Sequence, residues 1–265
     1  PDEAFITRGR MSHKCRRFEN KVALVTASSA GIGLAIAKRF AEEGAHVLIS
    51  SRKQKNVDAA LVELQEQGLK VDGMVCHVGK ADHRQALVKA AADKYGRIDI
   101  LVSNAAVQPL AGPALDAPDS IWDKIMDVNV RSHWQLCKDA KPFMHAGSNI
   151  LFVSSIAAFN PQAPLGLYGV SKTALLGLTR CLASELGPEG IRVNCLAPGT
   201  IKTKFSQMLW KNEAAKAHVE QQTYLGRVGE VEEMAGAAAF ICSMDGSYMT
   251  GETVVAAGGM PSRLC

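Results

Sequence analysis

The segment YGVSK, residues 168–172, carries two side chains suited to proton chemistry. Tyr168 and Lys172 are four positions apart, so on a helix they share one face. An ammonium about 4 Å from the phenol contributes up to roughly 4 kcal/mol at an effective dielectric near 20, which lowers the pKa of the tyrosine toward neutrality. Such a tyrosine can exchange a proton with a substrate oxygen. The same spacing also fits a plain amphipathic surface, so other motifs have to decide.

A glycine-rich turn, TASSAGIG at residues 26–33, follows the first expected strand. Gly31 and Gly33 have no Cβ, so backbone N–H groups and the positive end of the next helix can approach a pyrophosphate. The hydroxyls of Ser28 and Ser29 could add donors. We expect this turn to bind a dinucleotide, and a tight turn needed only for packing is the alternative.

The end of the second expected strand bears on which dinucleotide binds. At this position an acidic residue accepts the ribose 2′-OH of NAD, whereas an arginine accommodates the 2′-phosphate of NADP. Ser51 and Arg52 stand here, with no carboxylate. The sequence therefore favours NADP(H), unless Arg52 is only a solvated residue at a helix start.

The elements that must position these groups alternate between strands and helices along the chain, which is typical of βαβ units and a parallel sheet. We expect a single Rossmann-type, doubly wound α/β domain over residues 20–260, with helices on both faces of a seven-stranded parallel sheet. Flexible tails are expected at 1–19 and 261–265. Residues 1–10 precede Met11, and we expect them to be a processed leader or foreign to the native chain. The seven expected strands are 21–27, 46–51, 70–78, 98–105, 149–157, 192–199 and 252–258.

Sheets of this kind bind their ligands at the carboxyl ends of the strands. Small or polar residues stand at three of these ends, in SNAA (103–106), SSIA (154–157) and APGT (197–200). Ser155 precedes Tyr168 by thirteen residues, which is enough for a loop and a helix entry that return to the same edge. We therefore place the site where these segments meet.

Composition and charge exclude several classes of function. The formal net charge is only +4, and no basic block is interleaved with aromatic residues, so nucleic acid is not an expected partner. No apolar run reaches the roughly 18 residues that would span a bilayer. Seven cysteines form an odd set with no C-x-x-C pair, which indicates free thiols, a reducing intracellular compartment and no metal site.

Several motifs, in a fixed order over most of the chain, resemble those of the short-chain dehydrogenase/reductase superfamily. They are TASSAGIG, SNAA, DVNV, VSSIA, YGVSK, IRVNCLAPG and TGETVVAAGG. The resemblance implies an oxidoreductase in which Tyr168 is the acid/base, Lys172 lowers its pKa and binds the nicotinamide ribose, and Ser155 orients the substrate carbonyl. It also implies that Asn129 holds a water linking Lys172 to solvent, and that Asn104 braces the central strands.

The resemblance further implies a set of cofactor contacts, with two departures from the family pattern. The usual first glycine of the turn is Ala27 here, and the usual acidic residue before Val78 is His77, at the adenine contact. The residues expected to contact NADPH or NADP+ are Ser28, Ser29, Gly31, Ile32, Gly33, Ser51, Arg52, His77, Val78, Asn104, Ala105, Tyr168, Lys172, Pro198, Gly199, Ile201 and Thr203.

Stretches such as SSRKQKNVD, VCHVGKA and LAPGTIKT resemble most closely the peroxisomal, NADPH-dependent carbonyl and retinal reductases of this superfamily. A terminal Ser-Arg-Leu is a peroxisomal address that a receptor reads at the free carboxylate. Here Ser262, Arg263 and Leu264 are followed by Cys265, which displaces the address by one residue. We expect the peroxisome, with the cytosol or the mitochondrion as alternatives.

The interval from Thr200 to about Arg227 has no expected strand, and we interpret it as a lid over the substrate. Its segment FSQMLW is apolar, and no arginine suited to a substrate carboxylate stands out. This favours small-molecule ketones, dicarbonyls or retinal-like aldehydes, and steroids also fit. A helix pair packed on the core or on a neighbouring subunit is the alternative. The expected substrate contacts are Ile156, Phe159, Phe205, Met208, Leu209 and Trp210.

Two other functions share these motifs. A 3-ketoacyl-thioester reductase has the same catalytic set, and Lys202, Lys204 and Lys211 could bind the phosphopantetheine of its carrier. A dinucleotide-binding sensor without turnover would also keep the fold. The helices expected at 118–146 and 166–187 carry apolar positions beyond one core-facing stripe, and relatives pair these helices, so we expect a homotetramer.

Overall fold

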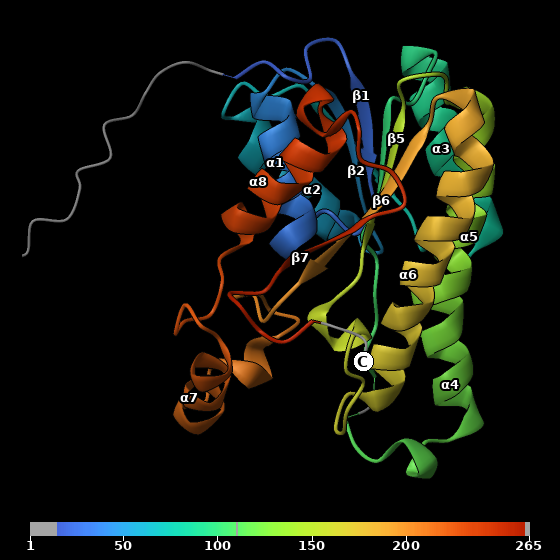
Figure 1. The fold of residues 1–265 in the computed structure, drawn as a ribbon. Helices are drawn as coiled ribbons and strands as arrows, with labels where there is room; N and C mark the ends of the chain where they lie inside the picture. Colours follow the sequence, from blue (N-terminus) through green and yellow to red (C-terminus); the bar gives the residue numbers. More distant parts are fainter. Residues whose placement is uncertain (1–14, 110, 263–265) are drawn as a thin grey trace, which may run out of the picture.

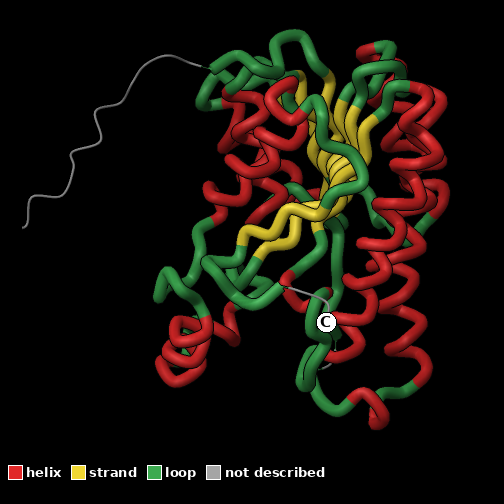
Figure 2. Tube along the Cα trace, in the orientation of Figure 1, coloured by secondary structure: helices red, strands yellow, loops and turns green. Residues whose placement is uncertain are grey.

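The computed structural model describes residues 15–109 and 111–262 of the chain. The expected leader at residues 1–10 and the Arg263–Cys265 part of the near-terminal address lie outside the described residues. Within these described residues, seven parallel strands form one sheet in the order β3-β2-β1-β4-β5-β6-β7. The sheet lies between two layers of helices (Figures 1 and 2). The expected single, doubly wound α/β domain is thereby confirmed.

Each strand falls within the run expected from the sequence. The strand order reverses between β1 and β4, and all pairs are parallel, so the carboxyl ends of the strands share one edge of the sheet. Open sheets of this type bind ligands at such a switch point. The strands are β1 (Val22–Val25), β2 (His46–Ser51), β3 (Val71–Val75), β4 (Ile100–Ser103), β5 (Asn149–Val153), β6 (Arg192–Pro198) and β7 (Thr253–Ala256).

The alternation of side chains along the strands divides the interior into two cores. In β1, Ala23 and Val25 point into one core and Leu24 points into the other. Both faces are therefore apolar, as expected for strands covered on each side. In Figure 1 the layer of α1, α2 and α8 covers one face, and the layer of α3, α4, α5 and α6 covers the other.

In the part of the chain that the structure describes, eight α-helices link the strands: α1 (Gly31–Glu42), α2 (Gln54–Gln65), α3 (Ala81–Tyr95), α4 (Asp119–Met126), α5 (Ser132–Ala140), α6 (Gly166–Leu186), α7 (Glu213–Gln222) and α8 (Val231–Cys242). A π-helical turn, η2 (Asp127–Arg131), joins α4 to α5, so the helix expected at 118–146 is interrupted. Short 3-10 helices are η1 (Ala114–Asp116), η3 (Lys141–Phe143), η4 (Ile156–Ala158), η5 (Gly187–Glu189), η6 (Gln207–Leu209) and η7 (Met244–Gly246).

The packed domain begins before the expected boundary at residue 20. Phe18 is fully buried, and its ring lies 4.6 Å from that of Phe40 on α1. Arg17 binds Glu43 through two hydrogen bonds of 2.6 Å. An aromatic anchor and an ion pair thus tie this part of the expected tail to the domain.

The cysteines within the described residues are free thiols. Cys76, Cys137, Cys195 and Cys242 are buried, as their apolar surroundings predicted, whereas Cys15 and Cys181 are exposed. No helix in residues 15–109 or 111–262 is both long and apolar enough to cross a bilayer.

Candidate active site

Tyr168 and Lys172 lie near the start of α6, at the carboxyl edge of the sheet. Both side chains are buried, with exposed fractions of 8% and 1%. Lys172 Nζ donates a 2.8 Å hydrogen bond to the carbonyl oxygen of Val153, at the end of β5. The same Nζ lies 5.7 Å from the centre of the Tyr168 ring. The helix therefore brings the two side chains together, as their spacing predicted.

Ser155 is held beside Tyr168 because the loop after β5 docks closely on α6. A Cβ on Gly169 would lie 2.8 Å from the carbonyl oxygen of Ala157, so only glycine permits this approach. Thr173 Oγ1 donates to the carbonyl oxygen of Ala158 at 2.6 Å. Ser155 Oγ accepts the N–H of Ala157 at 3.1 Å, and the same hydroxyl is hydrogen-bonded to the Tyr168 side chain.

Burial controls the protonation of the pair. It raises the pKa of Tyr168 to about 12, while the nearby Ser155 hydroxyl acts in the opposite direction. It also lowers the pKa of Lys172 to about 8. The expectation that Lys172 brings the pKa of Tyr168 toward neutrality is therefore wrong for the protein alone, because the ammonium faces Val153 and the phenol is desolvated. Tyr168 is protonated at neutral pH and can act as an acid.

Asn129 lies fully buried in the π-helical turn and ties two segments together. Its Oδ1 accepts the N–H of Val107 at 2.8 Å, and its Nδ2 donates to the carbonyl oxygen of Val107 at 3.0 Å. The second Nδ2 hydrogen goes to Ser171 Oγ, which in turn donates to the carbonyl oxygen of Tyr168. Ser171 was missed at the sequence level, although it stands within YGVSK.

The glycine-rich turn connects β1 to α1 and lies against the segment after β6. A Cβ on Gly31, whose φ is +60°, would lie 3.4 Å from Thr203 Cγ2. These two expected cofactor residues, far apart in sequence, are thus neighbours. A Cβ on Gly33 would lie 2.5 Å from Asn104 Nδ2, so glycine makes room for that amide. Asn104 Nδ2 donates to the carbonyl oxygens of Thr26 and Ala27, which supports its expected bracing role.

Ser28 does not offer its hydroxyl to a ligand. It is fully buried, its Oγ donates to the carbonyl oxygen of Val25 at 2.6 Å, and the same Oγ accepts the N–H of Ser50 at 3.0 Å. The expected hydroxyl donor at Ser28 is therefore wrong, because this side chain turns inward and closes the turn. Ser29 stays half-buried at the surface of the turn.

A group of basic residues gathers at the ends of β2 and β3. Burial and the charge of Arg52 lower the pKa of His77, with smaller effects of Lys80 and His83 in the same direction. The ring atom Nδ1 of His77 accepts the backbone N–H of Gly79 at 3.2 Å. The backbone N–H of His77 donates to Nδ1 of His83 at 3.3 Å. Lys80 and His83 were missed at the sequence level, because no motif pointed to the start of α3. The positive charges of Arg52 and Lys80 act on His77, and the carboxylate of Asp82 lies 3.9 Å from His83.

The remaining expected cofactor residues also lie along the carboxyl edge. A Cβ on Gly199 would lie 2.8 Å from the Cα of Ala257, so glycine lets the end of β6 approach the segment after β7. Ser51 and Ile32 are half-buried. The buried members are Val78, Ala105, Pro198 and Ile201.

The start of the expected lid covers the tyrosine. The ring of Phe205 lies 5.9 Å from that of Tyr168, and more than half of the Phe205 side chain is exposed. Trp210 Nε1 donates to the carbonyl oxygen of Thr203 at 3.1 Å, so this indole braces the segment. Met208 is 79% exposed. Ile156, Phe159 and Leu209 are half-buried, and α7 projects away from the sheet (Figure 1).

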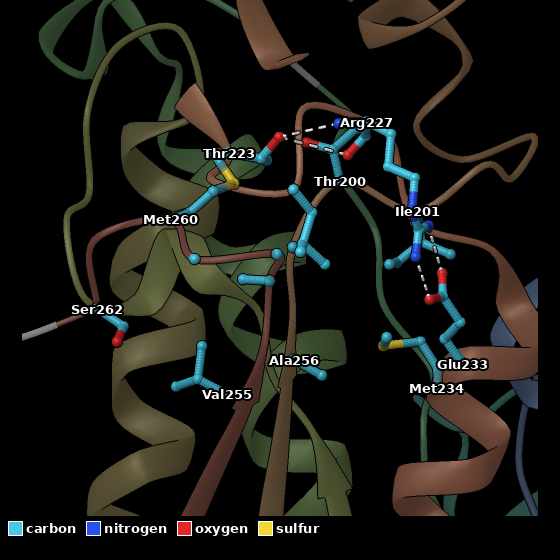
Figure 3. A pocket seen from close by; sticks show the side chains of 16 residues that line it. Thr200, Ile201, Thr223, Arg227, Glu233, Met234, Val255, Ala256, Met260 and Ser262 are labelled. Atoms are coloured by element: carbon cyan, nitrogen blue, oxygen red, sulfur yellow. Dashed lines mark hydrogen bonds and ion pairs between the residues drawn. The ribbon is translucent and has the colours of Figure 1, made fainter. Parts of the chain in front are cut away.

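A cavity of about 410 Å³ lies beside Gly199 and Ile201. Figure 3 shows its walls, with the Arg227–Glu233 ion pair on one side and the end of β7 on another. Neither Ser155 nor Tyr168 lines it.

The described residues fit a dinucleotide. The turn at Gly31 begins α1, and the first N–H groups of a helix have no intrahelical partner. Arg52 and its basic neighbours lie toward β2 and β3, whereas Tyr168 and Lys172 lie by β5. The start of α1, Arg52 and Tyr168 are thus spread along one edge, as an extended ligand would require.

Comparison with known proteins identifies relatives of this chain. Residues 26–261 match the family described as "Enoyl-(Acyl carrier protein) reductase". The chain is 57% identical to "Dehydrogenase/reductase SDR family member 4" of Oryctolagus cuniculus over 247 residues, which cover 92% of this chain and 95% of that protein.

Two solved structures have the same fold. In each comparison the matched part covers 92% of this chain and 98% of the chain in the solved structure. One is a short chain dehydrogenase from Burkholderia cenocepacia J2315 in complex with NADP, at 31% identity and a TM-score of 0.86. The other is a blue fluorescent protein from a metagenomic library in complex with NADPH, at 32% identity and a TM-score of 0.85. The resemblance expected from the motifs is confirmed. This chain therefore belongs to the short-chain dehydrogenase/reductase superfamily and is an oxidoreductase.

Proposed function

We propose that this oxidoreductase uses NADPH to reduce small carbonyl compounds, with ketones, dicarbonyls and retinal-like aldehydes as the substrate class. The observation that carries this proposal is a protonated, buried tyrosine whose side chain is hydrogen-bonded to the hydroxyl of Ser155. Tyr168 has a pKa of about 12, and the apolar ring of Phe205 lies next to it. A proton donor under an apolar cover suits the reduction of an uncharged carbonyl.

The cofactor would lie along the carboxyl edge. The turn at Gly31, with Thr203 against it, would hold the pyrophosphate, and Arg52 would bind the 2′-phosphate. When bound, NADPH supplies the hydride that reduces the carbonyl carbon. The solved relatives that contain NADP and NADPH support this choice of cofactor.

Tyr168 would deliver its proton to the substrate oxygen as negative charge develops there. Ser155 would donate a second hydrogen bond to the same oxygen and so stabilise that charge. Lys172 donates one of its three N–H groups to the carbonyl oxygen of Val153, so two N–H groups would remain to bind a ribose and a water. Both Nδ2 hydrogens of Asn129 are already donated, to Val107 and Ser171. In the proposed water relay, Asn129 would therefore accept a hydrogen bond from the water through the remaining lone pair of Oδ1.

A cofactor-consumption screen tests this proposal. Purified protein is mixed with NADPH or NADH and with aromatic ketones, diacetyl, retinal and simple acyl thioesters. We expect oxidation of NADPH in preference to NADH, with ketones, diacetyl or retinal among the best substrates. NADPH binding without oxidation by any carbonyl would instead support a dinucleotide sensor.

A 3-ketoacyl-thioester reductase is the second candidate, because the matching family is described by an acyl carrier protein reductase. Lys204 and Lys211 are exposed near the lid, whereas Lys202 pairs with Glu230 at 3.4 Å. Two free ammonium groups could contact a carrier phosphate. Higher turnover with 3-ketoacyl thioesters than with ketones would favour this candidate.

We also propose a homotetramer. Trp122 on α4, Trp134 on α5 and Val170 on α6 are exposed on the helices expected to pair. Phe240 and Met244 are exposed on or beside α8, on the other helical layer. Two separate apolar faces can support the two dimer contacts of a tetramer. Light scattering tests the assembly, and a monomer would contradict it.

The peroxisome is the compartment that we propose first, from Ser262, Arg263 and Leu264. Fluorescence microscopy of cells expressing the chain with and without Cys265 tests it. Import into peroxisomes only after removal of Cys265 would show that the receptor does not recognise the address when Cys265 follows it. The cytosol or the mitochondrion would then be the compartment of the full chain.

A further inference from the structure

The segment that leaves β4, residues 104–107, is held in place by side chains from its surroundings. At its start, Asn104 Nδ2 donates to two carbonyl oxygens of the glycine-rich turn, each at 3.1 Å. At its end, Asn129 binds both the N–H and the carbonyl oxygen of Val107. The backbone of this segment is thus fixed at both ends by amide side chains.

His133 binds the middle of the same segment. It lies in the first turn of α5, four residues after Asn129 of the π-helical turn η2. Its Nε2 lies 2.9 Å from the carbonyl oxygen of Ala105, and its side chain is fully buried. The ring also packs edge-on against Phe152 of β5, with 5.8 Å between ring centres.

The chemistry of this contact determines the state of the imidazole. A carbonyl oxygen only accepts, so Nε2 carries the hydrogen and Nδ1 does not. Burial and the charge of Lys172 lower the pKa of His133 to about 3, so the ring is neutral at physiological pH. Nδ1 has no hydrogen-bond partner in the part of the chain that the structure describes.

An unpartnered buried nitrogen destabilises the fold, and an apolar side chain of similar size would avoid this cost. The ring of His133 packs on Phe152, which belongs to one apolar core with Leu136 and Cys137, and the charge of Lys172 also acts on it. Packing alone therefore does not explain a histidine here. What the imidazole adds is one hydrogen bond to Ala105.

We propose that His133 is a positioning residue for the cofactor, which works by holding the backbone at Ala105. With Asn129 it forms a two-point clamp, in which Asn129 binds Val107 and His133 binds Ala105. This inference rests on the proposed function, in which Asn104 and Ala105 line the dinucleotide site. Without the clamp, the wall of that site would have more freedom, and cofactor binding would have to restrict it.

Two substitutions separate this role from simple space filling. His133→Leu removes the donor, whereas in His133→Gln the side-chain NH₂ can reach the same carbonyl oxygen. Ser132→Ala is the matched control, because Ser132 is also buried and its hydroxyl binds Val128 within its own helix at 2.7 Å. The dissociation constant for NADPH is measured by fluorescence titration, and stability by urea unfolding.

We expect His133→Leu to weaken NADPH binding about fivefold, the scale of one hydrogen bond. His133→Gln should restore most of the affinity, and Ser132→Ala should leave it unchanged. His133→Leu removes the unpartnered Nδ1 but leaves the carbonyl oxygen of Ala105 without its donor, so its two effects on stability oppose each other. If His133 only filled space, His133→Leu would leave NADPH affinity unchanged, because leucine also fills the site.

Each outcome has one meaning. Equal NADPH affinity of the natural chain and His133→Leu would overturn the inference while leaving the proposed function intact. Failure of the natural chain to bind NADPH would overturn the proposed function itself. If His133→Leu does not fold, His133→Met is tested by the same criteria.

Discussion

Lys172 Nζ donates its hydrogen bond to the carbonyl oxygen of Val153 and lies 5.7 Å from the centre of the Tyr168 ring. The ammonium is therefore anchored to the end of β5 and does not bind the phenol directly. Because desolvation then dominates, Tyr168 stays protonated and Lys172 titrates near pH 8. The protein alone is poised to give a proton, which suits reduction.

Tyr168→Phe removes the proposed acid and keeps the shape of the ring. Turnover should fall by at least about two decades, the usual contribution of a general acid, while NADPH affinity stays the same. Tyr224→Phe is the control, because Tyr224 is 88% exposed. Steady-state kinetics and NADPH titration measure the two quantities. Near-normal turnover of Tyr168→Phe would refute its role.

Arg52→Ala tests the recognition of the 2′-phosphate. The Michaelis constant for NADPH should rise by about one to two decades, the scale of a charged hydrogen bond, and that for NADH should change little. Lys53→Ala changes the exposed neighbouring cation and should have a smaller effect. If both Michaelis constants shift equally for Arg52→Ala, this residue does not read the phosphate.

Lys172 makes stability depend on pH. Its pKa is about 8 in the folded chain and 10.5 without burial, so between these values the unfolded chain binds more protons. Raising the pH through this window therefore stabilises the folded chain. Between pH 8 and 9.5 the natural chain should gain about 1–2 kcal/mol of unfolding free energy relative to Lys172→Met. Urea unfolding at both pH values measures this, and parallel curves for the two proteins would contradict it.

Ala27 has a φ of +49°, in the left-handed region that favours glycine. Its side chain is exposed, so Ala27→Gly loses little packing and relieves strain. The free energy of unfolding should rise by about 0.5–1 kcal/mol. Ala117→Gly, at a φ of −75°, should instead lower it by a similar amount. Thermal unfolding of the two variants compares them, and destabilisation by both would show that Ala27 is not strained.

The sequence could predict the strands and the proximity of the proposed catalytic residues. Runs such as 149–157 are apolar and β-branched, and the carboxyl ends of parallel strands share an edge whatever the details of packing. Ser155, Tyr168 and Lys172 therefore had to be near one another. The approach of Gly31 to Thr203 is equally a consequence of this edge.

The direction of individual polar atoms could not be predicted in this way. Ser28 points inward because its hydroxyl binds the carbonyl oxygen of Val25. Lys172 binds the carbonyl oxygen of Val153 at the end of β5 and not the phenol of Tyr168. His133 had no signal, since a lone histidine on a helix acquires its partner only when α5 packs against β4. Phe18 likewise shows its burial only once α1 is in place.

A crystal structure of the chain with NADP+ and a ketone or alcohol tests the central claim most directly. Our account predicts that Tyr168 Oη and Ser155 Oγ both lie within about 3.2 Å of the ligand oxygen. A Tyr168 side chain that points away from the ligand and the nicotinamide ring would contradict it.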